Sequence, residues 1–297
     1  MIASSRPKLA KVCVVGGGHG LEASISAARQ LAEEVTAVVG VADDGGSSGR
    51  LRDIFGLIPP GDMRRCMSSF LPDDSMVKDI IEYRFKDGEF KDHALGNLVF
   101  LAALDIFGST CRASAFMTDL FGVSGKVLPA SEEPLTLCAE LYNGRTIRGQ
   151  VQIHLSSGIK KVWVEPDLSG SPTETIEAIA SADAVVLGPG SLYTSVLAAA
   201  VVPDVRRALA DAKGTVVFVA NLKEQPNETI GVDVGAQIRA LTEHQIRYDF
   251  AIVDSSLSNS LDSSSFERPL MVRDVTAAGG YRHDALALAR ALEEILF

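Results

Sequence analysis

The chain has 297 residues, of which 46% are hydrophobic and 22% are charged, and its formal net charge at pH 7 is −10. This composition is typical of a globular protein with a full apolar core. The negative charge disfavours binding to nucleic acid or to an anionic membrane face, because both need a basic footprint. The apolar runs are too short to cross a bilayer, and the N-terminus lacks a hydrophobic signal core. We therefore expect a cytoplasmic protein with neither kind of partner.

The four cysteines are far apart in the sequence, at Cys13, Cys66, Cys111 and Cys138. No CxxC pair or Cys/His spacing suggests a zinc site. Buried thiols in a reducing compartment are the plain interpretation.

The first elements predict a βαβ unit. Lys11–Val15 is a short apolar run that ends at the glycine-rich segment GGGHG, and Leu21–Leu31 has the apolar spacing of a helix. Val35–Val41 then reads as a second buried strand. A strand, a glycine turn, a helix and a second strand make one right-handed crossover.

A helical stretch and then an alternating stretch follow. The predicted helices are 62–71, 74–85, 96–107 and 111–121. From Gly122 the pattern alternates, in runs at 127–129, 135–141, 146–155 and 161–165. Asn143-Gly144 between two such runs is a strong hairpin signal. We therefore predict a small antiparallel β insertion, or an extension of the sheet, at about 123–166.

The remainder alternates between strands and helices. Strands are predicted at 184–187, 215–220, 250–253 and 270–272, and helices at 173–181, from 191, at 205–212, 234–243 and 283–295. This order predicts an α/β fold, a three-layer doubly wound and mostly parallel Rossmann-like sheet. We expect a single nucleotide-binding domain over 1–297, with the serine-rich stretch 255–265 as a mobile surface loop.

The most unusual stretch is VADDGGSSGRLRDIFGLIPPGDMRR, from Val41 to Arg65. Residues 43–49 lack the apolar spacing of a strand or a helix, so we predict a loop there. Its small residues bring backbone and hydroxyl donors close to an anion, and the candidates are Gly46, Ser47 and Ser48. A solvated polar turn is the alternative.

Three other polar loops are predicted at the same edge, because ligands of open α/β sheets bind beyond the carboxyl ends of the strands. The first is the glycine turn, with the candidates Gly17, Gly18, His19 and Gly20. Leu21 stands at the third glycine of the dinucleotide fingerprint, so a tight structural turn explains the segment equally well. His19 either faces an anion or is only a turn residue.

Two adjacent acids follow the second predicted strand. Asp43 or Asp44 is placed to accept hydrogen bonds from a ribose hydroxyl. With a substrate diphosphate, the same pair could hold Mg²⁺. Adjacent side chains tend to point in opposite directions, so we expect one functional acid. Arg50 and Arg64 would supply positive charge nearby, although surface arginines are commonly only solvated.

The remaining candidates lie on two later loops and one helix start. Asn97 is either a helix cap or an amide that contacts a sugar hydroxyl or a base edge. Residues 188–195, GPGSLYTS, repeat the order of strand, glycine turn and helix, which gives a second anion site with Gly190, Ser191 and Thr194. Ser191 as a simple N-cap is the alternative. Asn221 ends the next strand, and Gln225, Asn227 and Thr229 could close the pocket.

These motifs occur in the order VGGGHGL, VADDGGSSGRLRD, PPGDMRRC, HALGNL, IRGQV, VVLGPGSLYTSV and NLKEQPNET. Together they resemble the bacterial gluconeogenesis-factor family over about 11–254. The resemblance implies a cytoplasmic protein that binds UDP-N-acetylglucosamine and is needed for cell shape, or morphogenesis, and for growth on gluconeogenic carbon sources. It is more distantly similar to 2-phospho-L-lactate transferase, which shares the glycine turn and the paired aspartates.

Three classes of function remain open at this point. The first is a regulatory protein that binds UDP-N-acetylglucosamine or another nucleotide diphosphate. The second is a magnesium-dependent transferase of a nucleotide-linked phospho-group, with Asp43 or Asp44 at the metal and His93 or the other acid as base. The third is a nicotinamide-dependent oxidoreductase, which rests on fold analogy alone. No catalytic residue is assigned, and a homodimer is possible.

Overall fold

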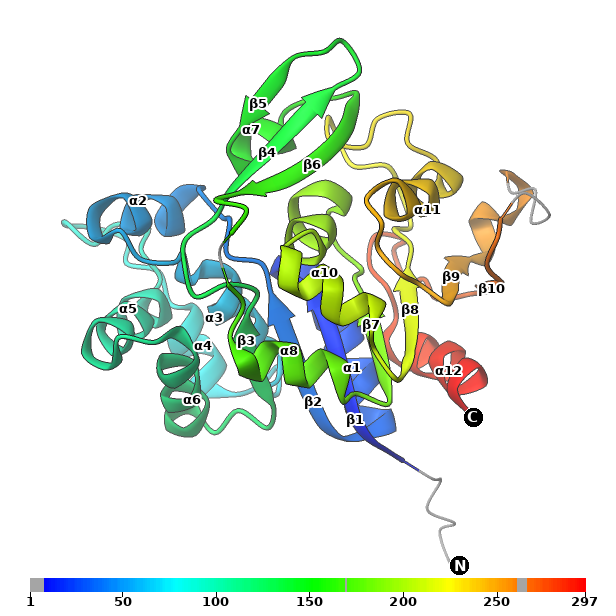
Figure 1. Ribbon diagram of the computed structural model, residues 1–297. Coiled ribbons are helices and arrows are strands. Elements are labelled where there is room, and N and C mark those ends of the chain that lie inside the picture. Colours follow the sequence, from blue (N-terminus) through cyan, green and yellow to red (C-terminus); the bar gives the residue numbers. More distant parts are fainter. Residues whose placement is uncertain (1–7, 169, 261–265) are drawn as a thin grey trace, which may run out of the picture.

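A seven-stranded parallel sheet forms the centre of the molecule (Figure 1). The computed structural model describes residues 8–168, 170–260 and 266–297. The strand order is β10-β9-β8-β7-β1-β2-β3. The strands are β1 (Leu9–Gly16), β2 (Ala32–Val39), β3 (Lys126–Pro129), β7 (Ala184–Leu187), β8 (Thr215–Val219), β9 (Phe250–Asp254) and β10 (Leu270–Arg273).

Helices cover both faces of this sheet, as the doubly wound prediction requires. The helix α1 contacts α12, and α8 and α10 lie together on the opposite face (Figure 1). The helices are α1 (Leu21–Leu31), α2 (Gly46–Phe55), α3 (Pro60–Ser69), α4 (Met76–Glu82), α5 (Leu95–Phe107), α6 (Thr110–Phe121), α7 (Gln150–His154), α8 (Thr173–Ala180), α9 (Ala198–Ala200), α10 (Pro203–Ala210), α11 (Val234–Glu243) and α12 (Ala285–Leu296). The predicted fold class is confirmed.

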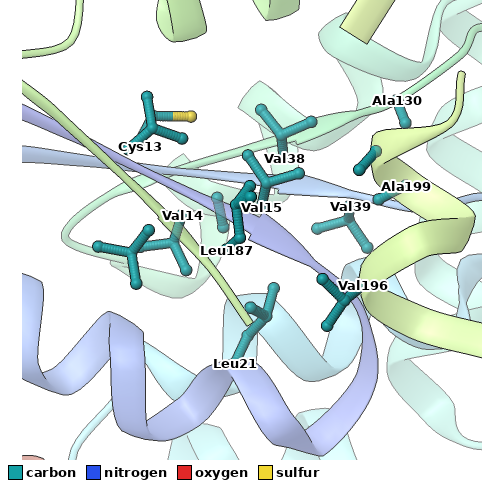
Figure 2. Close-up of a cluster of buried hydrophobic side chains, with 14 of the residues drawn as sticks. Cys13, Val14, Val15, Leu21, Val38, Val39, Ala130, Leu187, Val196 and Ala199 are labelled. Carbon is teal, nitrogen blue, oxygen red and sulfur yellow. The ribbon is translucent and has the colours of Figure 1, made fainter. Parts of the chain in front are cut away.

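The core lies where the central strands meet these helices. Val14, Val15, Leu187, Leu21 of α1 and Val196 on the segment after β7 belong to one cluster of buried apolar side chains (Figure 2). Strands covered on both faces are apolar at every position rather than at alternate ones, which is why the central runs contain little else than Val, Ala and Leu. Leu21, at the third fingerprint position, fills space beneath the first glycine turn, because a Cβ on Gly16 would lie 3.0 Å from its Cδ2.

The second sheet is antiparallel, with three strands in the order β5-β4-β6. They are β4 (Thr136–Leu141), β5 (Thr146–Arg148) and β6 (Ile159–Glu165), and the predicted hairpin turn joins β4 to β5. Two details of the expected insertion at 123–166 are wrong. The run 127–129 is β3, which pairs in parallel with β2 in the main sheet. The run 146–155 is a strand only as far as Arg148, because α7 follows it.

Two short irregular helices complete the path near the carboxyl ends of the strands. A 3-10 turn, η1, spans Gly18–Gly20, and a π-helix, η2, spans Leu192–Leu197. Part of the serine-rich stretch forms a third, η3 (Ser255–Ser260), and the expectation of a loop at 261–265 lies outside the described residues. None of the helices in the described part of the chain has the length and apolar character that a bilayer span needs.

A buried histidine joins the small sheet to α11. The Nε2 atom of His244 accepts a hydrogen bond of 2.9 Å from the backbone N–H of Val162 on β6, and its Nδ1 lies 2.6 Å from the carbonyl oxygen of Ala240. This pattern requires a neutral ring with its proton on Nδ1. Burial lowers the pKa of His244 below its usual value, against smaller opposing effects.

We predict that acid destabilises the protein through this contact. A lowered pKa in the folded state means that the unfolded chain binds the proton more readily, so the free energy of unfolding falls as the pH drops below about 6.5. In His244→Gln the amide oxygen can still accept from Val162 but does not titrate. The melting temperature of this variant should fall less between about pH 7.5 and pH 5.5 than that of the wild type. Equal falls would contradict the assignment, since buried His283 and His93 add the same trend to both proteins.

Candidate functional site

A cleft of about 1300 Å³ opens at the carboxyl ends of the parallel strands. The strands β1 and β7 are neighbours in the sheet. From β1 the chain continues to β2 and β3 on one side, and from β7 it continues to β8, β9 and β10 on the other, so the connections that follow these two strands lead in opposite directions. The cleft is lined by the loops after β1, β2, β7 and β8, by one side of α7, and by residues between 277 and 285. Several polar loops therefore lie at one edge of the sheet, as the sequence predicts.

The two glycine turns pack directly against each other. A Cβ on Gly20 would lie 2.4 Å from the carbonyl oxygen of Pro189 and 2.5 Å from the Cα of Gly190. No residue with a side chain fits there without a shift of backbone. Asn221 fixes the second turn, because its Nδ2 donates to the Gly190 carbonyl at 2.8 Å and its Oδ1 accepts from the Gly190 N–H at 3.3 Å. Asn221 thus shapes the floor of the cleft while it also lines it.

The predicted loop at 43–49 is wrong in its second half, because α2 begins at Gly46. The N-cap, Gly45, has no side chain, so the first N–H groups of this helix receive no side-chain cap. Ser47 and Ser48 are buried in the first turn and line the cleft together with Gly46. The backbone N–H groups of an uncapped first turn can bind an anion, which is the role that the predicted loop was expected to have.

Three polar groups meet at this helix start. Ser47 Oγ lies 3.0 Å from Nδ1 of His93, and the Nδ2 of Asn97 donates to the same oxygen at 3.2 Å. Burial and the charge of Arg50 lower the pKa of His93, which favours its neutral ring. Asn97 lines the cleft, whereas His93 is not among its lining residues. The Asn97 side chain therefore both fixes the position of the Ser47 hydroxyl and lines the cavity.

The two adjacent acids point in different directions. Asp43 lines the cleft, and its Oδ1 accepts from the N–H of Gly45 at 2.9 Å. Asp44 turns away, and its Oδ1 accepts from the N–H of Val151 in α7 at 2.9 Å. The expectation of a single acid at the ligand thus favours Asp43. Asp44 connects the small sheet to the main one.

A second acid, Asp62, faces the cleft beside Asp43. Burial and the charge of Asp43 raise the pKa of Asp62 to about 6, although Arg65 opposes the rise. The Arg65 guanidinium donates to Asp62 Oδ1 at 2.7 Å, and both residues line the cavity. This acid belongs to the PPGD motif at the start of α3, but no sequence pattern distinguishes it from its neighbours.

The two predicted arginines lie elsewhere. Arg64 is 1% exposed and forms an ion pair with Glu82, so its positive charge is neutralised by a residue of α4. Arg50 is exposed on α2 and is not among the lining residues. Arg65 and Arg84 supply the positive charge at this end of the cleft instead. The buried Arg64 and the cavity-facing Arg65 are adjacent residues of α3.

A protein carboxylate already occupies the start of η2. Glu228 is fully buried, and its Oε1 accepts from the N–H groups of Tyr193 at 2.9 Å and of Thr194 at 3.1 Å. Its Oε2 accepts from Thr194 Oγ1 at 2.8 Å. The donors of Thr194 are therefore engaged within the protein. The Gly190 N–H is likewise engaged, by Asn221, so the part of the expected second anion site that faces the cleft is Ser191, whose Oγ accepts from the Nε2 of Gln225 at 2.9 Å.

The helix α7 forms the wall of the cleft on the side of the small sheet. Gln150 Nε2 donates to the carbonyl oxygen of Thr194 at 2.7 Å, and Nδ1 of His154 lies 2.9 Å from Oε2 of Glu228. Both side chains line the cavity, and the side chain of His154 is 49% exposed. Sequence reasoning missed both residues because it placed them on a strand.

The far end of the cleft comes from the C-terminal part of the chain. Lys223 Nζ lies 3.9 Å from the centre of the Tyr281 ring, and Arg282 and His283 follow in the same wall. Asp254, at the end of β9, accepts hydrogen bonds from Ser256, Val275 and Thr276. These bonds lower its pKa to about 2. The pair Gly279-Gly280 before YRHD was the only sequence signal for a polar turn here.

The structure thus brings most of the predicted residues to one cavity. The predicted residues that line it are Gly17, Gly18, Gly20, Asp43, Gly46, Ser47, Ser48, Asn97, Gly190, Ser191, Thr194 and Asn221. Asp44, Arg50 and Arg64 are not among the lining residues. His19 belongs to η1, and its side chain lies outside what the structure describes. Within the described ranges, no three His, Cys, Asp or Glu side chains are grouped as a metal cluster would need.

We predict that Glu228→Gln lowers the free energy of unfolding by about 2 kcal/mol, because it removes the charge that several donors share in a dry site. Glu224→Gln is the matched control, since Glu224 lies exposed on the same loop and accepts a hydrogen bond from the Gly231 N–H. It should change stability by less than about 0.5 kcal/mol. Urea denaturation of the two variants tests this, and equal effects would show that the buried carboxylate does not hold η2.

Comparison with known proteins places the chain in a family. A model of the 2-phospho-L-lactate transferase family, CofD, matches residues 12–285. The gluconeogenesis factor of Bacillus subtilis is 36% identical over 254 residues, which are 85% of this chain and 79% of that protein. A relative from Clostridium acetobutylicum, provisionally named a gluconeogenesis factor, is 38% identical over 267 residues, or 87% of this chain. This chain spans 59% of that relative's length.

The fold agrees with this relationship. A crystal structure of a UPF0052 family member from Bacillus halodurans superposes with a TM-score of 0.90 at 30% identity, and the match covers 97% of this chain and 100% of the other. The similarity therefore includes the small antiparallel sheet as well as the parallel one. The chain belongs to the CofD family and, by its relatives, to the gluconeogenesis factors.

Proposed function

We propose that the cleft binds a nucleotide diphosphate sugar, with UDP-N-acetylglucosamine as the first candidate, and that the protein acts as a regulator in the cytoplasm. Its expected roles are in cell shape and in growth on gluconeogenic carbon sources. The names of the relatives support the gluconeogenic part. The choice of ligand rests on the motif resemblance and on the chemistry of the cleft.

One observation carries the proposal. Three backbone segments converge on one cavity, namely the turn at Gly17–Gly20, the uncapped start of α2 at Gly46–Ser48, and the backbone at Ser191 after the second glycine turn. Such groups bind phosphate oxygens without adding net positive charge. Arg65 and Arg84 border the same cavity. A diphosphate is a ligand group that uses several such donors, and a cleft of about 1300 Å³ has room for a nucleoside and a sugar as well.

A divalent cation fits this site in one place. Asp43 and Asp62 face the cavity beside each other, whereas Asp44 is engaged with α7, so Mg²⁺ would be held by the first pair rather than by adjacent acids. Hard carboxylate oxygens with bound phosphate are the usual magnesium environment. When bound, the ion would neutralise phosphate charge. These two acids would otherwise repel the ligand.

We expect UDP-N-acetylglucosamine with Mg²⁺ to raise the melting temperature by several degrees, since a ligand at about 100 times its Kd adds about 2.7 kcal/mol. In Asp43→Asn the bond to Gly45 survives but the charge does not, so the ligand shift should shrink while the unliganded melting temperature changes little. Asp53→Asn, exposed on α2, is the control and should keep the full shift. GDP and NAD complete the screen. If no nucleotide shifts the transition at millimolar concentration, the proposal fails.

A second candidate function is transfer of a nucleotide-linked phospho-group. The carboxylate pair Asp43 and Asp62 and the match to the transferase family favour it. Incubation with nucleotide-activated phospholactate and a deazaflavin alcohol tests it through release of the nucleotide. We expect no release that depends on the deazaflavin alcohol if the protein is not a transferase. Release that requires the alcohol and disappears in Asp43→Asn would make it a transferase.

A further inference from the structure

His154 and Glu228 form a carboxylate–histidine pair at the cleft wall. Glu228 is fully buried, and besides the His154 ring it accepts two backbone N–H bonds and the hydroxyl of Thr194. Each of these three groups donates its hydrogen to an oxygen of the carboxylate. Because an ionised carboxylate only accepts hydrogen bonds, the proton between the two groups lies on Nδ1 of His154.

The other ring nitrogen remains available. Nε2 of His154 bonds to no group in the described part of the chain, and the side chain is 49% exposed and lines the cleft. In a neutral ring with its proton on Nδ1, Nε2 carries the lone pair and can accept a proton. A carboxylate behind the ring also stabilises the imidazolium that forms when it does so.

The other described histidines are less suited to this task. His244 uses both ring nitrogens within the core. His93 has its Nδ1 at Ser47 and is not among the lining residues. His283 lines the cleft, but its Nε2 lies 3.1 Å from the Ala220 carbonyl, which is a neutral partner. Of the four, His154 alone combines a carboxylate partner with a nitrogen open to the cavity.

The position of the pair relates it to the proposed diphosphate. Glu228 is bonded to Thr194, three residues beyond Ser191 and close to the Gly190 turn. The Gln150 side chain on the same short helix as His154 also reaches the Thr194 carbonyl. The ring therefore stands on the side of the cleft where the second set of phosphate donors lies.

We propose that His154 is a general base and that the protein hydrolyses the nucleotide diphosphate ester it binds. Water is the nucleophile. Its oxygen bonds to one phosphorus of the diphosphate, its proton passes to Nε2 of His154, and the bond from that phosphorus to the bridging oxygen breaks with its electron pair on that oxygen. For UDP-N-acetylglucosamine the products are UMP and N-acetylglucosamine 1-phosphate. This inference rests on the proposed function, because it needs the nucleotide in the cleft.

The experiment measures UMP release from UDP-N-acetylglucosamine with Mg²⁺ by the full-length wild type, by His154→Gln and by His154→Ala. Removal of a general base lowers the rate by about 100-fold or more. We expect that loss in kcat with KM little changed, because His154 acts on water rather than on the ligand. Added imidazole should restore part of the activity of His154→Ala, which a purely structural histidine would not permit. Gln152→Ala, exposed on the same helix, is the matched control and should keep wild-type turnover.

The possible results separate this inference from the function it rests on. The melting shift with ligand is recorded on the same samples, so folding and binding of each variant are known. A wild type that is stabilised by the ligand but releases no UMP overturns the hydrolysis and leaves the binding function standing. Equal turnover in wild type and His154→Gln also overturns it. If no nucleotide stabilises the wild type, both the proposed binding function and the hydrolysis are wrong.

Discussion

The site depends on one close backbone contact, between the turn after β1 and the turn after β7. Gly20 can approach Pro189 and Gly190 only because it has no side chain, since a Cβ there would lie 2.4 Å from a carbonyl oxygen. The two strands are neighbours in the sheet, yet their loops lead to opposite halves of the molecule. The contact therefore sets how far apart the two halves of the cleft are, and so which ligand can span it.

The acids in and around the cleft have two roles. Glu228, Asp44 and Asp254 accept backbone N–H groups and hold together segments that are distant in the chain. Asp43 and Asp62 instead face the cavity together, and burial, together with the charge of Asp43, raises the pKa of Asp62. Repulsion between two carboxylates in a cleft is tolerated where a cation relieves it. The first group stabilises the fold, whereas the second is poised for a ligand.

Much of this could be predicted from local sequence patterns, and the parts that could not share a cause. The strands and most helices follow from apolar spacing, and the glycine turns mark the ends of β1 and β7. The helix α2 was missed because Gly46–Gly49 has poor helix propensity, and its burial against other segments overrides that propensity. The roles of Asp44, Arg64 and Glu228 depend on partners 107, 18 and 34 residues away. Spacing within a motif carries no information about such partners.

The charge of the cleft explains how an acidic chain can hold an anionic ligand. With a net charge of −10, the chain repels phosphate at long range, and salt screening reduces that repulsion to the last few ångströms. There the aligned N–H groups of α2 and of the glycine turns, with Arg65 nearby, dominate the local field. Because these donors are fixed by the backbone, they favour the anion only at one position. The overall charge meanwhile disfavours contact with polyanions such as nucleic acid, so the proposed selectivity for a small phosphorylated ligand would follow from the contrast between the whole surface and one cavity.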